Sequence, residues 1–132
     1  MNTYPGGVWP VMLTPFTADG QVDEQGLRAL VDWYIQSGVD GLFASCQSSE
    51  IFNMSFEERM DIARITVEQS AGRVPVVASG FTDYELDQQV KPIEAMAATG
   101  VDAVILLTNR LAREDESDQA LMERVDALLE RI

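Results

Sequence analysis

Polar side chains follow the apolar runs of this chain, and these are the residues that could take part in chemistry. Thr14 ends the first run, Gln47 and Ser48 follow the second, and Asn109 and Arg110 follow a later one. A guanidinium can grip a carboxylate with two parallel hydrogen bonds, whereas a hydroxyl or an amide forms single ones. In this acidic chain Arg110 therefore predicts either a surface ion pair, the more common role of an arginine, or an anion-binding position.

The residues around them have simpler interpretations beside the chemical ones. Cys46 at a strand end predicts a small buried hydrophobic residue, with a reactive thiol as the alternative. Ser48 and Ser49 fit a cap or a turn as well as a ligand contact, and Thr14 either binds within a site or only ends a strand. Glu50 is predicted to hold its loop through hydrogen bonds, with catalysis as the alternative.

The acidic run 114–118 predicts a solvated helix start, because carboxylates stabilise the N-terminal end of a helix dipole. Metal binding by this run is the alternative. We expect no metal site and no cofactor. Trp9 and Trp33 are expected in the core or at an interface.

Joints between a helix and a strand must position these residues. Segments 37–43 and 99–105 each place a glycine before an apolar run, and a third joint begins at Gly72. The three glycines are 34 and 28 residues apart, close to the ~31 residues per unit of a (β/α)8 TIM barrel of ~250 residues. The sequence therefore predicts an α/β fold of the (β/α)8 type, with 1–132 as a single domain covering about the first four βα units.

The expected strands are 8–16, 41–46, 74–79 and 103–108, which are apolar along most of their length. Such strands belong to parallel sheets that are covered on both faces. An open flavodoxin-like sheet is the other possible architecture, although no glycine-rich phosphate loop follows the first strand. In both architectures the chemistry lies at the carboxyl ends of the strands.

Capping patterns predict where the helices begin. Ser55 with Glu58 forms a capping box, and Thr82 with Glu85 shows the same spacing before the next helix. Pro92 lies inside that next helix and is expected to kink or restart it.

Charge and composition exclude several classes of partner. The 22 acidic and 9 basic residues give a formal net charge of −13, which repels nucleic acid and anionic membranes. No apolar run approaches the ~20 residues of a membrane span, and residues 1–5 lack the basic-then-apolar pattern of a signal peptide. A single cysteine fits a reducing compartment. We expect a cytoplasmic protein whose partners are small molecules or proteins.

Several segments occur in a fixed order: Pro10-Val11-Met12-Leu13-Thr14-Pro15-Phe16, Asp19-Gly20-Gln21-Val22-Asp23, Gly38-Val39-Asp40-Gly41-Leu42, Glu50, Ser55-Phe56-Glu57-Glu58-Arg59 and Gly72-Arg73-Val74-Pro75-Val76-Val77-Ala78. Together they resemble the dihydrodipicolinate synthase and N-acetylneuraminate lyase family. Members of that family are (β/α)8 barrels, typically tetramers, and class I aldolases. A lysine in them forms a Schiff base with pyruvate or a similar keto acid. The resemblance therefore implies a lyase and a homo-oligomer.

The family's carboxylate-binding motif, Gly-Thr-Thr-Gly-Glu or a close variant, corresponds to residues 46–50. The resemblance implies that Ser48, at the second threonine position, binds the substrate carboxylate. Gln47 offers an amide in place of the first hydroxyl, and Thr14 is a third expected substrate-binding residue. The family's proton-relaying tyrosine is replaced by Arg110 and Leu111. Arg110 is therefore expected to favour a substrate with a second carboxylate.

The family's Schiff-base lysine lies on a sixth strand, which this chain does not contain. Lys91, the only lysine, is expected on a helix outside the barrel. We expect no catalytic residue in this chain. The predicted function is that of a lyase that acts on pyruvate or a related 2-keto acid through a Schiff base in the complete barrel. The alternative is a non-catalytic half-barrel module for binding or assembly, with a small carboxylate site.

Overall fold

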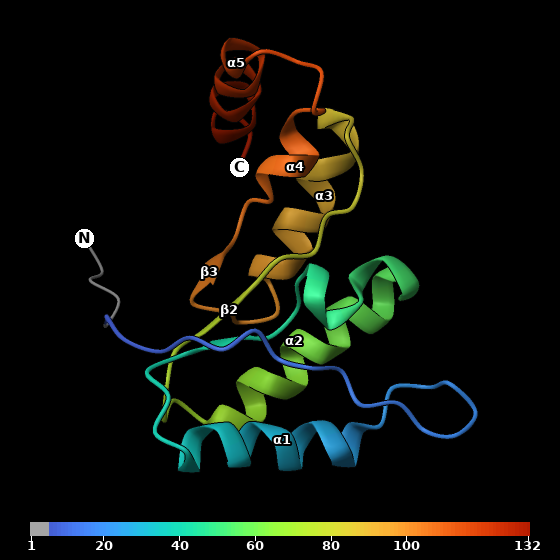
Figure 1. Ribbon diagram of the computed structural model, residues 1–132, viewed down its shortest axis with the longest axis vertical. Helices are drawn as coiled ribbons and strands as arrows, with labels where there is room; N and C mark the ends of the chain where they lie inside the picture. The colour runs from blue at the N-terminus through green and yellow to red at the C-terminus, as the bar shows by residue number, and fades with distance from the viewer. Residues whose placement is uncertain (1–5) are drawn as a thin grey trace.

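The computed structural model describes residues 6–132, so residues 1–5, which the signal-peptide argument used, lie outside it. Helices and strands alternate along the chain (Figure 1): α1 (Glu24–Gln36), β1 (Leu42–Phe43), the 3-10 turns η1 (Gln47–Ser49) and η2 (Ile51–Asn53), α2 (Phe56–Ser70), β2 (Val76–Ala78), α3 (Leu86–Ala97), β3 (Ala103–Val104), α4 (Thr108–Leu111) and α5 (Asp118–Leu129). This alternation is the α/β order that the sequence predicts.

The strands form a parallel sheet in chain order, β1-β2-β3. The register pairs Phe43 with Val77 and Val77 with Ala103. The extended segment before α1 continues the sheet beyond β1 through one parallel bridge, from Val11 to Phe43. Chain order of this kind is the order of a barrel, whereas a flavodoxin-like sheet places its first strand between two others.

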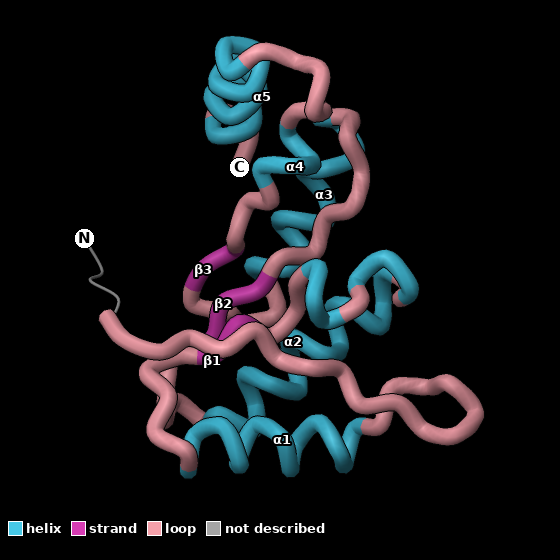
Figure 2. Tube along the Cα trace, viewed as in Figure 1, coloured by secondary structure: helices cyan, strands magenta, loops and turns pink. Residues whose placement is uncertain are grey.

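All the strands are shorter than expected: β1 covers Leu42–Phe43 where the sequence predicts 41–46, and β2 covers Val76–Ala78 where it predicts 74–79. The segment 8–16 is drawn as a loop (Figure 2), because it forms only isolated bridges, at Val11 and Phe16, and two of its residues, Pro10 and Pro15, have no N–H to donate. The run 103–108 is a strand only at Ala103–Val104, and α4 begins at Thr108. The count of four βα units remains a prediction.

The repeated Gly-Val-Asp joint ties each strand to its neighbour in the same way at two places. Val8 N–H donates to Asp40 Oδ2 over 2.7 Å, and the Asp40 N–H donates back to the Val8 carbonyl. Val76 N–H donates to Asp102 Oδ2 over 2.8 Å, and the Asp102 N–H donates back to the Val76 carbonyl. The aspartate of the repeat therefore fixes the relative position of neighbouring parallel segments.

The capping box of α2 is confirmed. Ser55 Oγ accepts from the Glu58 N–H, and Glu58 Oε2 accepts from the Ser55 N–H. The capping box that Thr82 and Glu85 predict is wrong: α3 begins at Leu86, and Glu85 is an N-cap without a side-chain bond.

Both the start of α3 and its course through Pro92 differ from the prediction. Thr82 Oγ1 accepts a hydrogen bond from Arg59 Nη1 of α2, 3.1 Å away, so its hydroxyl is engaged elsewhere. Pro92 lies inside α3 without restarting it, since the helix continues to Ala97. Arg59 itself is buried, and this burial lowers the pKa of its guanidinium.

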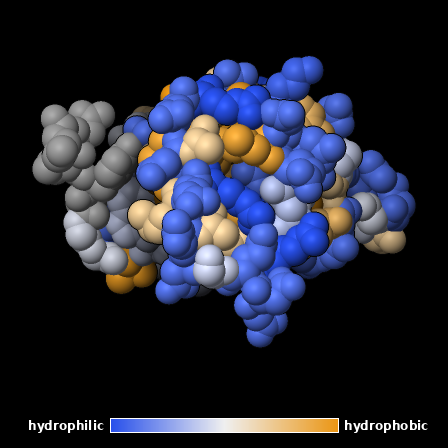
Figure 3. All heavy atoms as spheres, turned by 90° about the horizontal axis from the view of Figure 1, so that it is seen from above, coloured by the Kyte–Doolittle hydropathy of each residue, from blue (hydrophilic) through white to orange (hydrophobic). Residues whose placement is uncertain are grey.

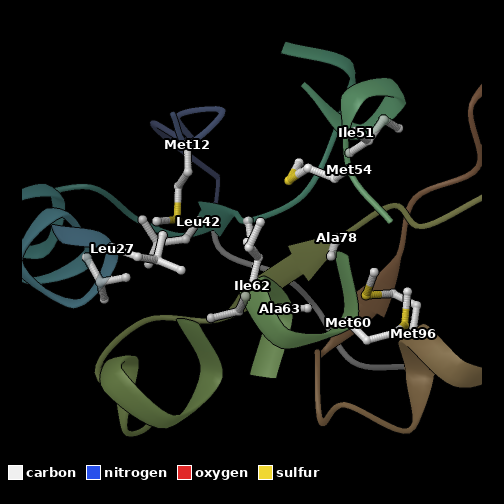
Figure 4. Packing of buried hydrophobic residues seen from close by; sticks show 13 residues of the cluster. Met12, Leu27, Leu42, Ile51, Met54, Met60, Ile62, Ala63, Ala78 and Met96 are labelled. Carbon is white, nitrogen blue, oxygen red and sulfur yellow. The ribbon is translucent and has the colours of Figure 1, made fainter. Parts of the chain in front are cut away.

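The main core lies between the sheet and the helices that cover it (Figure 4), and we call it the main cluster. Its buried members are Met12, Leu27, Val31, Leu42, Ala44, Ile51, Met54, Met60, Ile62, Ala63, Val76, Ala78 and Met96. Met60 of α2 and Met96 of α3 come together close to Gly80, where an added Cβ would lie 2.7 Å from Met96 Cε. A glycine at this position lets the chain pass directly over the two methionines.

A smaller cluster, which we call the second cluster, joins α3, α4 and α5 through the buried residues Phe81, Ile93, Leu111 and Leu128. Trp33 on α1 is 59% exposed, so it does not lie in the core, and the expected interface position for it stays a prediction; Trp9 is half-buried and packs on Gly41. None of the helices in the described part of the chain has the length and hydropathy that a membrane span needs.

The surface is largely hydrophilic, with hydrophobic residues in small patches on the face shown in Figure 3. Along the first segment, Val8 and Leu13 are 62% and 63% exposed, and Val11 and Phe16 are each 38% exposed. This apolar edge lies where a closed barrel has a further strand.

Candidate functional site

The segments that follow β1, β2 and β3 lie at the carboxyl ends of parallel strands and carry the candidate site residues. The first is 44–54, which contains η1 and η2, the second is 79–85, and the third is 105–113, which contains α4. Parallel pairing places all three at one edge of the sheet.

Ser49, and not Ser48, is the serine that the fold uses in the first of these segments. Ser49 is fully buried, and its Oγ donates to the Met12 carbonyl over 2.6 Å. Thr14 Oγ1 donates to the Ser49 carbonyl over 2.8 Å. Thr14 and Ser49 therefore fasten the first segment of the chain to η1, and the side chain of Ser48 is exposed.

Glu50 has a left-handed backbone, with φ 67° and ψ 31°, where η1 ends and η2 begins. Its side chain accepts a hydrogen bond from Asn53 Nδ2, 3.4 Å from Glu50 Oε2, which agrees with the expected role of holding the loop. Gln47 is half-buried at the start of η1. Cys46 is buried, with its Sγ 3.7 Å from Ser49 Oγ, as a small hydrophobic residue would be placed.

Arg110 lies on α4 and is flanked by two aromatic rings from the other two segments. Its guanidinium carbon is 4.2 Å from the centroid of the Phe52 ring and 4.8 Å from that of the Tyr84 ring. No ion pair or side-chain hydrogen bond joins its guanidinium to any residue between 6 and 132. The alternative of a surface ion pair does not describe this side chain.

A second arginine also contacts the Tyr84 ring. The guanidinium carbon of Arg113 lies 5.3 Å from the centroid of that ring. Tyr84 and Arg113 line a pocket of about 780 Å³ together with Asn109 and the acidic residues Glu114 and Glu116. Leu111, at the expected position of the relay tyrosine, is buried in the second cluster and does not face this pocket.

The acidic run leads into α5, whose N-cap is Ser117. Glu116 forms an ion pair with Arg124, and this hydrogen-bonded guanidinium lowers the pKa of Glu116 to about 2. Residues 6–132 contain no cluster of three or more carboxylate or thiol side chains that could hold a metal ion.

Ser45 and Ser79 are fully buried, and each hydroxyl lacks a hydrogen-bond partner among residues 6–132; the Nε of Arg110 is the third buried polar atom in this state. The register that pairs Phe43 with Val77 continues to Ser45 and Ser79, and the Ser79 N–H donates to the Ser45 carbonyl over 2.7 Å. The two serines therefore lie side by side where β1 and β2 end. All three atoms follow strand ends.

Four residues of this region were not predicted as site residues: Phe52, Tyr84, Ser45 and Ser79. The serines have a recognisable signal, because both strands end in the same Ala-Ser pair. The two rings have none, since a single aromatic residue in a loop does not reveal which cation it will contact. Lys91 is exposed on α3, as expected for a helix outside the sheet.

Comparison with known proteins gives relatives that are longer than this chain. A 4-hydroxy-tetrahydrodipicolinate synthase of Acidobacterium capsulatum is 42% identical over 76% of this chain and 33% of its own length. One of Koribacter versatilis is 34% identical over 91% of this chain and 42% of its own length. The chain therefore spans between a third and about two fifths of these relatives.

Solved structures give the same picture. A prophage protein of the dihydrodipicolinic acid synthase family from E. coli K12, solved with pyruvate, is 28% identical and superposes with a TM-score of 0.80 over 96% of this chain and 41% of its own. The fold is thus α/β with a parallel sheet and corresponds to part of a barrel. The model of the dihydrodipicolinate synthetase family matches residues 4–117. This chain belongs to the dihydrodipicolinate synthetase family, a family of lyases.

Proposed function

We propose that residues 1–132 form the N-terminal half of a (β/α)8 barrel that acts as a lyase on pyruvate or a related 2-keto acid. The observation that carries this proposal is the family match over 4–117, with three strand ends gathered at one edge of a parallel sheet. A relative in the same family was solved with pyruvate. The substrate is then the small-molecule partner, and a reducing, cytoplasmic setting fits the free Cys46.

The chemistry is the formation of a Schiff base. A lysine amine adds to the keto carbon, and loss of water leaves a C=N bond that draws electrons from the neighbouring carbon. Ser48, Gln47 and Thr14 are the proposed contacts for the substrate carboxylate and its surroundings, since they lie on or against η1 at the carboxyl end of β1. In this proposal the donors of Gln47 and Ser48 fix the keto acid while the amine attacks, and Thr14, whose hydroxyl donates to the Ser49 carbonyl, holds η1 in place beside it.

The amine must come from the part of the barrel that this chain does not contain. Lys91 is exposed on α3, a helix that packs behind the sheet, and does not reach the strand ends. Catalysis therefore requires the completing half of the barrel, and the 132-residue chain alone has no turnover.

The exposed apolar edge at Val8, Val11 and Leu13 supports a second part of the proposal. An unpaired, apolar sheet edge drives association. The chain therefore exists as a homodimer or larger assembly, or joined to the rest of its barrel. Sedimentation velocity tests this part, and a folded monomer at low concentration would contradict it.

Borohydride reduction in the presence of pyruvate, followed by mass spectrometry, tests the lyase proposal. With the completing half present, we expect one adduct on a lysine of that half, and no adduct on the chain alone. A Lys91→Arg variant is the matched control and should trap pyruvate as well as the parent. An adduct on Lys91, or no adduct in the complete barrel, would overturn the proposal. The latter result would favour a non-catalytic half-barrel.

A further inference from the structure

Arg110 differs from most arginines of this chain in having no acidic partner among residues 6–132. Five others form ion pairs with carboxylates: Arg28, Arg64, Arg73, Arg124 and Arg131. The chain carries 22 acidic residues and a net charge of −13, so acidic side chains are abundant. A guanidinium that none of them reaches within residues 6–132 is available to an external anion.

The aromatic neighbours hold this guanidinium without using its hydrogen-bond donors. Phe52 comes from the segment after β1 and Tyr84 from the segment after β2, whereas Arg110 follows β3. Cation–π contacts of this kind are each worth ~0.5–2 kcal/mol. Because aromatic faces accept none of the in-plane N–H bonds, the two rings orient the guanidinium and leave its donors unpaired.

The unpaired donors indicate which anion fits. A carboxylate is planar and accepts two parallel N–H bonds from a guanidinium, and it carries a single charge. A phosphate dianion would meet stronger repulsion from a chain of net charge −13. The two terminal N–H groups supply the parallel bonds, because the Nε, which has no partner among residues 6–132, is buried.

We propose that Arg110 binds the distal carboxylate of the substrate, so that the protein acts on dicarboxylic 2-keto acids. This inference rests on the proposed lyase function, because it takes the first carboxylate to lie near Ser48. Arg110 is then a specificity-determining residue. Phe52 and Tyr84 act through Arg110 and are positioning residues.

The first experiment follows the Nε–H resonances of the arginines by NMR in the 132-residue chain, titrated with acetate against chloride at constant ionic strength. We expect the Arg110 resonance to shift and saturate with acetate, and the Arg113 resonance to move little. A Phe52→Leu variant should bind acetate about two- to fivefold more weakly, because it keeps apolar volume and removes the ring. Equal responses to acetate and chloride would overturn the site, and a stronger response to phosphate would overturn the choice of carboxylate.

The second experiment measures the binding of two probes to the complete barrel, 2-oxoglutarate and 2-oxopentanoate, which differ in the distal carboxylate. Arg110→Met should weaken 2-oxoglutarate binding about 10- to 100-fold and leave 2-oxopentanoate binding within about twofold. Arg110→Lys keeps the charge but not the fork, so it should recover only part of the loss. Arg64→Met, which removes an arginine of α2 that pairs with Asp61, is the matched control and should change neither. Equal loss for both probes, or none for either, would contradict the proposal.

The two proposals fail separately. If acetate binds at Arg110 but pyruvate is never trapped in the complete barrel, the lyase function is wrong and the anion site stands. If pyruvate is trapped but Arg110→Met leaves both probes unchanged, the lyase function stands and the diacid specificity is wrong.

Discussion

The main cluster contains thirteen buried residues from the first segment to α3, whereas the second cluster, around α4 and α5, contains four. On α5, Met122 and Leu129 are 56% and 55% exposed, while Leu128 of the same helix is fully buried. The segment that carries Arg110 belongs to the region of the second cluster, which has fewer buried residues. The contrast indicates that this chain fills the core beneath β1 and β2 by itself and leaves the region after β3 to be covered.

Truncation of buried side chains should give the largest difference in stability between the main cluster and the second cluster. Ile62→Ala in the main cluster should lower the free energy of unfolding by ~2–5 kcal/mol, because its fully buried site cannot collapse around the cavity. Leu128→Ala should cost about 2 kcal/mol, near the lower end, since half-exposed neighbours can close the gap. Urea unfolding followed by circular dichroism measures both. Leu129→Ala is the exposed control, with an effect within ~0.5 kcal/mol. A larger loss at Leu128 than at Ile62 would reverse the comparison.

Substitution of the paired serines at the strand ends should raise the stability of the chain, whereas core truncation lowers it. Ser45→Ala and Ser79→Ala each remove a buried hydroxyl without a partner within residues 6–132, so each should raise the stability of the chain by about 1 kcal/mol. Ser49→Ala removes a hydroxyl that is bonded to the Met12 carbonyl and should cost about 1 kcal/mol. Denaturant midpoints at equal m-values compare the three. Destabilisation by all three variants would show that Ser45 and Ser79 are satisfied.

Helix caps give a smaller test of the same contrast. Ser55→Ala breaks the capping box of α2 and should cost about 1 kcal/mol. Glu85→Ser gives α3 the side-chain cap that it lacks and should add about 0.5 kcal/mol. Glu85→Ala is the control and should change little, since no cap bond is lost. Thermal unfolding of the four proteins decides, and a gain from Glu85→Ala as large as from Glu85→Ser would exclude the capping explanation.

The smallest expected effect is a pH dependence of the stability of α5, which Glu116 precedes. The Arg124 ion pair lowers the pKa of Glu116 from 4.5 to about 2, so the carboxylate form favours the folded state. Its stabilisation is present above the unfolded pKa of 4.5 and is lost as the pH falls towards 2. The protection factors of the α5 amides, which correct for the pH dependence of intrinsic exchange, should therefore fall in this window, and Glu116→Gln should remove that part of the pH dependence. A pH response that is unchanged in Glu116→Gln would assign it to other carboxylates.

Local signals predicted the fold where the responsible contact lies within a few residues. The capping box of Ser55 and Glu58 depends on a spacing of three, and the sequence shows it directly. The same spacing misled at Thr82, because its hydroxyl is taken by Arg59, 23 residues earlier. The repeated Gly-Val-Asp joint was visible, whereas the bond from Asp102 to the neighbouring strand at Val76 was not.

The candidate site divides in the same way. Its location at strand ends follows from the order of helices and strands, and the family resemblance selected Ser48 and Arg110. The sequence could not show that Ser49 would hold the Met12 carbonyl, 37 residues away, or that Arg110 would lie between Phe52 and Tyr84. These contacts join different strand ends, and no local pattern encodes them.

Lys91 has one more consequence, which concerns labelling. It is the only lysine in 132 residues, and it is exposed on α3. An amine-reactive dye or crosslinker therefore reacts with one side chain, which lies on a helix behind the sheet and apart from the strand ends. A fluorophore placed there would report the arrival of a partner chain by energy transfer without touching the proposed substrate contacts. The scarcity of lysine makes this protein a convenient subject for watching a barrel assemble.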